Sequence, residues 1–172
     1  MTEWILVRHP GDGRSIAVGA YALAALALAG CRSDRDARPT VHVACTTDGR
    51  SDPTTAPVSR RGTAGALEFT LVSTSPRPPA RGDNTWLVEL REVSAGGAAL
   101  PPLSGATLEV SPFMPDHGHG SPVKVVVSPT AIAGQYQLAP INLWMPGYWE
   151  TTIHATIGAV SDVAVFRFCI AN

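Results

Sequence analysis

The amino-acid sequence predicts an all-β protein, and three features carry this prediction. Apolar and polar residues alternate along most of the chain after residue 63, as in strands with one buried and one solvated face. Fifteen prolines and sixteen glycines among 172 residues interrupt that pattern, and they suit short strands joined by turns. No stretch shows the apolar spacing of an amphipathic helix.

The first two expected strands are separated by a clear break. Residues 67–71 read Leu-Glu-Phe-Thr-Leu, and residues 86–91 read Trp-Leu-Val-Glu-Leu-Arg. The proline-rich segment 75–79 lies between them, and Gly-Gly at 96–97 turns the chain after the second. Each strand therefore has one apolar face and is bounded by turn residues.

Five more strands follow by the same criterion. They cover residues 107–110, 123–127, 134–138, 149–157 and 162–170. Seven short strands with turn signals between them favour an antiparallel β-sandwich of immunoglobulin-like topology. A small β-barrel is the alternative.

The first 30 residues are expected to be a lipoprotein signal peptide. Arg8 and Arg14 precede the apolar run 16–29, which is too short for a membrane span of about 20 residues. The tetrad Leu28-Ala29-Gly30-Cys31 resembles a bacterial lipobox, which implies cleavage before Cys31 and lipid on that cysteine. An uncleaved anchor or a plain signal peptide is the alternative.

This N-terminus predicts a location in the bacterial cell envelope, anchored to a lipid bilayer through Cys31 and facing the periplasm. Arg32 stands where an aspartate would signal retention in the inner membrane, so the outer membrane is favoured. Residues 31–62 are polar and show little periodicity, as expected of a flexible tether. The β-sandwich domain is expected to span residues 63–172.

Two cysteines remain when Cys31 carries lipid, namely Cys45 and Cys169. An even number in an exported chain predicts one disulfide between them. Two free thiols are the alternative, because the sequence does not show whether their Cα atoms come within bonding range.

Charge and motif content argue against two classes of function. The formal net charge is −1 and Lys124 is the single lysine, so no basic patch predicts a nucleic-acid partner. The chain has no nucleophile elbow, zinc-protease motif or phosphate-binding loop, so we do not expect an enzyme.

Two loops concentrate the residues that can bind a metal. One reads Met114-Pro-Asp-His117-Gly-His119-Gly, and the other contains Met145-Pro-Gly. If residues 117–119 are extended, the two imidazoles point to the same face. Thioether and imidazole ligands suit copper, and thioether favours Cu(I), whereas zinc prefers Cys, His or carboxylate.

The predicted copper site therefore has Met114, His117, His119 and Met145 as ligands. Four neighbours are expected to support it: Asp116 by orienting a histidine, and Trp144, Tyr148 and Trp149 by forming a hydrophobic wall that limits access of water. The competing interpretation is that His-Gly-His is a polar turn and that the methionines fill gaps in the core. Trp149 is expected in the core in either case, and His154 on the surface.

These residues resemble the FixH/YtkA-like family. The matching motifs are Met114-Pro-Asp-His-Gly-His-Gly120, Gly134-Gln-Tyr136 and Met145-Pro-Gly-Tyr-Trp-Glu150, and the resemblance covers about residues 65–170. It implies an immunoglobulin-like sandwich at the outer face of a bacterial membrane. FixH relatives are linked with copper handling during cytochrome oxidase assembly, although this chain has a lipobox in place of their transmembrane helix.

Two functions follow as hypotheses. The first is a lipoprotein that buffers or delivers Cu(I) to an envelope copper protein or an oxidase assembly partner. The second is a non-catalytic structural or interaction module that binds no metal.

Overall fold

The computed structural model describes Cys45 and residues 49–171. They belong to one compact unit, Thr40–Asn172. The signal peptide, the predicted lipidation site Cys31 and His42 lie outside the described residues. Within the described part, no helix has the length and apolar character needed to cross a membrane.

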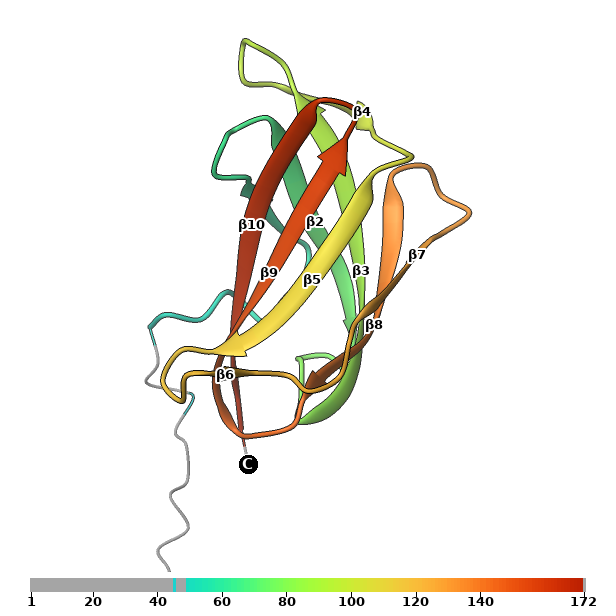
Figure 1. Cartoon of the computed structure of the whole chain (residues 1–172). Helices are drawn as coiled ribbons and strands as arrows, with labels where there is room; N and C mark the ends of the chain where they lie inside the picture. The colour runs from blue at the N-terminus through green and yellow to red at the C-terminus, as the bar shows by residue number, and fades with distance from the viewer. Residues whose placement is uncertain (1–44, 46–48, 172) are drawn as a thin grey trace, which may run out of the picture. The chain divides into compact units, whose positions relative to one another are not determined.

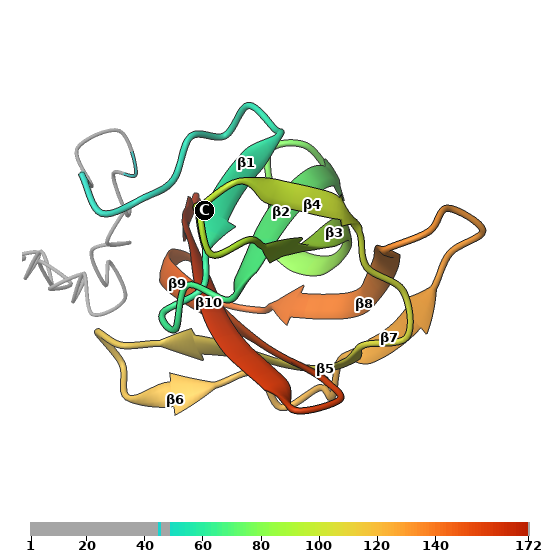
Figure 2. The ribbon, with the colours of Figure 1, turned by 90° about the horizontal axis from the view of Figure 1, so that it is seen from above.

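Two antiparallel sheets face one another and form a sandwich (Figures 1 and 2). The larger sheet has the order β1-β2-β3-β8-β7, with β4 also paired to β3, and the smaller has the order β10-β9-β5-β6. The strands are β1 (Val58–Arg61), β2 (Leu67–Ser75), β3 (Gly82–Val93), β4 (Ala99–Pro102), β5 (Thr107–Met114), β6 (His119–Gly120), β7 (Val126–Pro129), β8 (Gln135–Leu143), β9 (Gly147–Ile157) and β10 (Val160–Ile170).

The predicted fold class is confirmed, and each of the seven expected strands has a counterpart. The alternation places apolar side chains of β2, β3, β9 and β10 inward, where they are buried. The expected strand 123–127 pairs only from Val126 onward. Val126 is 60% exposed while Val125 is buried, so the alternation holds although the pairing begins later.

Three strands were not expected from the sequence: β1, β4 and β6. They are two to four residues long, too short to show an apolar period. β1 pairs through its backbone with Leu71 to Glu68 of β2. It lies before residue 63, so the sheet begins on the tether side of the predicted domain boundary.

Aromatic side chains fill the space between the sheets. Trp86 of β3 makes edge-to-face contacts with Phe166 and Phe168 of β10, at ring-centroid distances of 6.4 and 5.4 Å. Trp149 of β9 is 1% exposed, as the sequence predicts. Burying such large apolar surfaces is the main source of the sandwich's stability.

A buried carboxylate joins the two sheets at the β1–β2 turn. Asp162 of β10 is 2% exposed. It accepts hydrogen bonds from the backbone N–H groups of Ala64, Ala66, Leu67 and Val163, at 2.7 to 2.9 Å. Burial raises its pKa, but these four donors outweigh that effect and hold the pKa below its ordinary value. A side chain at Gly62 would collide with this carboxylate.

The chain before β1 is fixed to the smaller sheet. The predicted disulfide between Cys45 and Cys169 is present, with the Cα atoms 5.3 Å apart. Asp52 is 5% exposed; its N–H donates to the Arg167 carbonyl and its carboxylate accepts from the Arg167 N–H, each at 2.8 Å. Arg60 of β1 forms an ion pair with the same carboxylate. Residues 49–52 are therefore part of the folded domain.

Candidate functional site

The two methionine loops lie at the same end of the sandwich (Figure 1). Residues 115–118 connect β5 to β6, and residues 144–146 connect β8 to β9. The end of the Met114 side chain lies against Gly147, where a Cβ atom would come within 2.7 Å of its terminal methyl carbon. The sheet topology therefore brings together two loops that are about 30 residues apart in sequence.

The first loop is a tight hairpin turn. The N–H groups of His117 and Gly118 both donate to the Met114 carbonyl, at 3.2 and 2.9 Å. Gly118 has φ of 69°, a left-handed conformation that glycine adopts without steric cost. Residues 117–119 are therefore not extended throughout, which was the condition under which the sequence placed both imidazoles on one face, because the chain reverses at Gly118 and only His119 lies on a strand.

The turn nevertheless brings the two imidazoles together. The ring centroids of His117 and His119 lie 5.7 Å apart, with the planes inclined by 51°. A ring centre lies roughly 3 Å from a metal that its nitrogen binds at about 2 Å. Two rings at this separation can therefore share one ion. His117 is exposed and His119 is half-buried, so the pair is open to solvent.

The second loop contributes an aromatic ring to this pair. His119 stacks on Trp144, with ring centroids 5.2 Å apart and planes inclined by 28°. Trp144 is 40% exposed and its carbonyl accepts from Arg81 at 2.9 Å. The stack limits the orientations of the His119 ring and links the two loops.

The two methionines differ in their surroundings. Met114 is fully buried and belongs to the hydrophobic core. Met145 is half-buried and packs against that core from its edge. Burial of Met114 agrees with a gap-filling role for that thioether, while the half-buried Met145 keeps part of its side chain accessible.

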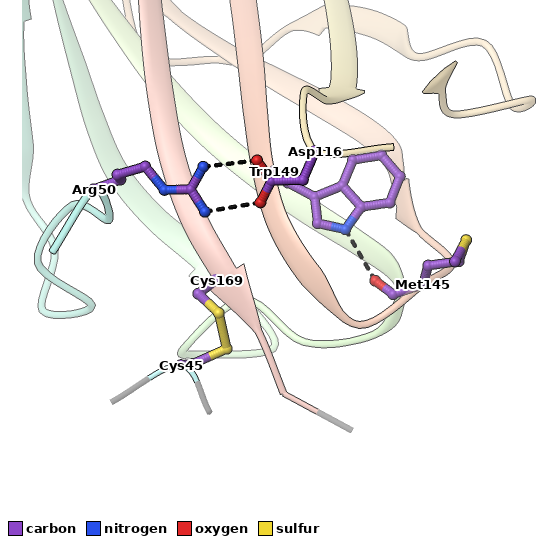
Figure 3. The surroundings of a disulfide bond; sticks show 6 residues. All are labelled: Cys45, Arg50, Asp116, Met145, Trp149 and Cys169. Atoms are coloured by element: carbon purple, nitrogen blue, oxygen red, sulfur yellow. Dashed lines mark hydrogen bonds and ion pairs between the residues drawn. A yellow bond between two sulfur atoms is a disulfide. The ribbon is translucent and has the colours of Figure 1, made fainter. Parts of the chain in front are cut away.

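The expected supporting residues occupy three different places. Trp144 stacks on His119 at the surface. Trp149 points into the core and donates its indole N–H to the Met145 carbonyl at 2.9 Å (Figure 3). Tyr148 is on the opposite face of β9, under the guanidinium of Arg50. The three aromatic rings therefore do not form a single wall.

Asp116 has a different partner from the histidine that the sequence suggests. Both of its carboxylate oxygens accept from Arg50, each at 2.8 Å (Figure 3). These hydrogen bonds lower the pKa of Asp116, against a smaller effect of burial, and the charges of Arg50 and His117 lower it further. Sequence reasoning missed Arg50 because it lies 66 positions away, in a segment without periodicity.

Replacing Trp149 with phenylalanine is expected to lower the free energy of unfolding by about 1–2 kcal/mol. The phenyl ring keeps most of the apolar contact, but the carbonyl of the half-buried Met145 loses its donor. Urea unfolding of the variant measures the loss. Replacing the exposed Trp144 with phenylalanine provides the comparison and should change the free energy by less than about 0.5 kcal/mol.

The described residues contain no cluster of the common metal-binding side chains. Among residues 49–171 and Cys45, no group of three or more His, Cys, Asp or Glu side chains is placed to hold a metal ion. A pocket of about 380 Å³ lies elsewhere, between the start of β5 and β7. It is mostly apolar, and the Tyr136 hydroxyl in its lining bonds to Ala106 and Leu103. The paired histidines therefore remain the candidate site.

Comparison with known proteins identifies the family. No curated protein and no solved structure matches the chain. A model of the YtkA-like family matches residues 62–154, which is more than half of the chain. The matched range runs from the turn before β2 into β9 and so contains both methionine loops. With its β-sandwich and its Met-His hairpin, this chain belongs to the YtkA-like family.

Proposed function

We propose that this protein is an envelope lipoprotein that binds copper as Cu(I), through His117, His119, Met145 and Met114, and buffers the metal or delivers it to a partner. The observation that supports it most strongly is the pair of imidazoles 5.7 Å apart beside the Met145 loop. Imidazole and thioether together are a copper ligand set. Membership of the YtkA-like family is consistent with a place in the cell envelope.

The ligands enter this proposal with different roles. His117 and His119 supply the accessible nitrogen atoms, and the half-buried Met145 is the nearer of the two thioethers to solvent. Met114 lies in the hydrophobic core. It can bind the ion only if the ion lies between the two methionine loops. The thioether of Met145 favours Cu(I), because soft sulfur ligands suit that ion.

The anchor supports delivery to a membrane protein. An extended chain spans at most about 3.5 Å per residue, so lipid on Cys31 would hold Cys45 within roughly 50 Å of the bilayer. The disulfide then joins this short tether to the C-terminal strand β10. An envelope copper protein in the same membrane would be within reach.

An anaerobic Cu(I) titration of the full chain in detergent, against a chromophoric chelator, tests the proposal. We expect one tight equivalent. The variant Met114→Leu/His117→Gln/His119→Phe/Met145→Leu should bind at least roughly 100-fold more weakly, since removing even a residue that only orients a metal ligand costs about 10- to 100-fold.

These substitutions are chosen to preserve the fold. Leucine conserves the volume of the buried Met114, whereas alanine would cost about 2–5 kcal/mol. Phenylalanine at position 119 keeps a ring against Trp144. The control His154→Gln changes a histidine on the outer face that bonds Ser161 and should bind copper as the wild type does. Equal binding by the quadruple variant would exclude the site.

One observation favours a second function, a non-catalytic structural or interaction module without metal. Met114 is completely buried, as a packing residue is. In that case neither wild type nor variant binds Cu(I) in the titration, and the exposed Trp144 and Phe113, at 40% and 41%, become the surface on which to look for a protein contact.

A further inference from the structure

The segment before β1 reaches across the smaller sheet to the Met-His turn. Asp52 fixes this segment to β10 through two backbone contacts with Arg167. Two residues earlier, the Arg50 guanidinium lies 3.8 Å from the centre of the Tyr148 ring. Its two terminal nitrogens then donate to the two oxygens of Asp116, which is adjacent to His117 in the turn. Figure 3 shows this bidentate contact between Arg50 and Asp116.

We propose that Arg50 is a positioning residue of the His117/His119 site. The inference rests on the proposed function, since the site is the copper site named there. In this role Arg50 acts through Asp116: it holds the Asp116 carboxylate, and Asp116 belongs to the turn in which His117 lies. The turn itself is closed by two hydrogen bonds to the Met114 carbonyl and by the short β5–β6 pairing that flanks it, and the Arg50–Asp116 contact ties it to the segment before β1.

The geometry of the contact explains why arginine is required. A planar guanidinium can meet both oxygens of a carboxylate while its face lies on an aromatic ring. Lysine offers a single ammonium and cannot do both. Exposed ion pairs contribute little in general. This one differs because Asp52 anchors the segment that carries Arg50 and because Tyr148 fixes the plane of its side chain.

Restricting the turn matters for affinity. A metal that binds two histidines in a mobile turn must order that turn on binding, and this lowers affinity. With Arg50 in place, the order exists before the ion arrives. Loss of Arg50 is therefore expected to make the turn more mobile and to weaken copper binding. The stability of the sandwich as a whole should change little.

The test uses Arg50→Gln in the full chain, with two measurements. Hydrogen exchange at the His117 and Gly118 amides reports the turn without any metal, and we expect it to be roughly three- to tenfold faster in the variant. Cu(I) titration should show affinity weaker by a similar factor. Arg91→Gln is the control, because it removes an arginine–carboxylate ion pair, with Glu89, on the other sheet and far from the turn.

Two further variants separate positioning from a loss of charge. Arg50→Lys keeps the charge and should behave like Arg50→Gln. The exchanged pair Arg50→Asp/Asp116→Arg restores the contact and should recover part of the protection. Exchange rates in Arg50→Gln within twofold of wild type would overturn the inference.

The two proposals fail in different ways. If Arg50→Gln binds copper as the wild type does and its amide exchange rates are unchanged, the proposed copper site is unaffected. The proposed role of Arg50 is then wrong. Absence of copper binding in the wild type removes the proposed function, and the exchange rates alone then decide whether Arg50 orders the turn.

Discussion

Asp162→Ala is expected to lower the free energy of unfolding by about 3–5 kcal/mol, because it leaves four backbone N–H groups near the β1–β2 turn without their acceptor. Three of these donors belong to the turn and the first residue of β2, so the turn itself should loosen. Chemical denaturation at neutral pH measures the loss. Asp162→Asn keeps one acceptor oxygen and should lose less.

The same residue gives the protein a sensitivity to acid. The pKa of Asp162 in the folded state is below its ordinary value, so the unfolded chain takes up this proton more readily than the folded one. The stabilisation is fully present above the ordinary pKa of about 3.9 and is lost as pH falls below it. The difference in stability between wild type and Asp162→Asn should therefore shrink as pH falls from about 3.9 through the folded-state pKa of Asp162.

An exposed carboxylate provides the control for both experiments. Glu109 on the outer face of β5 is exposed, and Glu109→Gln should change the free energy by less than about 0.5 kcal/mol at every pH. A loss at Asp162 no larger than at Glu109 would show that the buried carboxylate does not support the turn.

Opening the Cys45–Cys169 disulfide is expected to cost about 2–5 kcal/mol. The two cysteines are 124 positions apart, and a cross-link over so long a loop restricts the unfolded chain strongly in the chain-entropy model. The variant Cys45→Ser measures this by urea unfolding. Because the effect acts on the unfolded state, the m-value should rise in the variant as that state expands.

Reduction of the wild type by a dithiol should reproduce the effect of Cys45→Ser, and the same dithiol should leave Cys45→Ser unchanged. A wild type whose unfolding is the same with and without the dithiol would mean that the cross-link adds nothing to stability. The comparison also separates the disulfide from Asp52, which holds the neighbouring segment independently.

The sequence was sufficient to predict the sandwich and its core. An alternating pattern fixes which face of each strand is buried, because side chains on a strand point alternately to its two sides. Leu67, Phe69 and Trp86 are buried for this reason. The pattern does not predict β4 and β6, because these strands are too short to show an alternation of apolar and polar residues. Their formation depends on pairing with neighbouring strands.

The sequence also singled out the two methionine loops and the paired cysteines, since residue type alone indicates which side chains are able to bind a metal or form a disulfide. It indicated that His117 and His119 could lie close together if the stretch between them were extended. The two rings do lie close together, but across a turn. Alternation describes strands and contains no information on a turn, which depends on the local hydrogen bonds to Met114 and on the left-handed Gly118.

Only the tertiary structure decided how the parts of the site meet. Strand order places both methionine loops at one end, buries Met114 while leaving Met145 at the edge, and puts Tyr148 and Trp149 on opposite faces of β9. It also brings Arg50 to Asp116 and Asp162 to the β1–β2 turn. These contacts join residues far apart along the chain, and no local preference of either partner specifies them; they follow from the way the two sheets pack around one core.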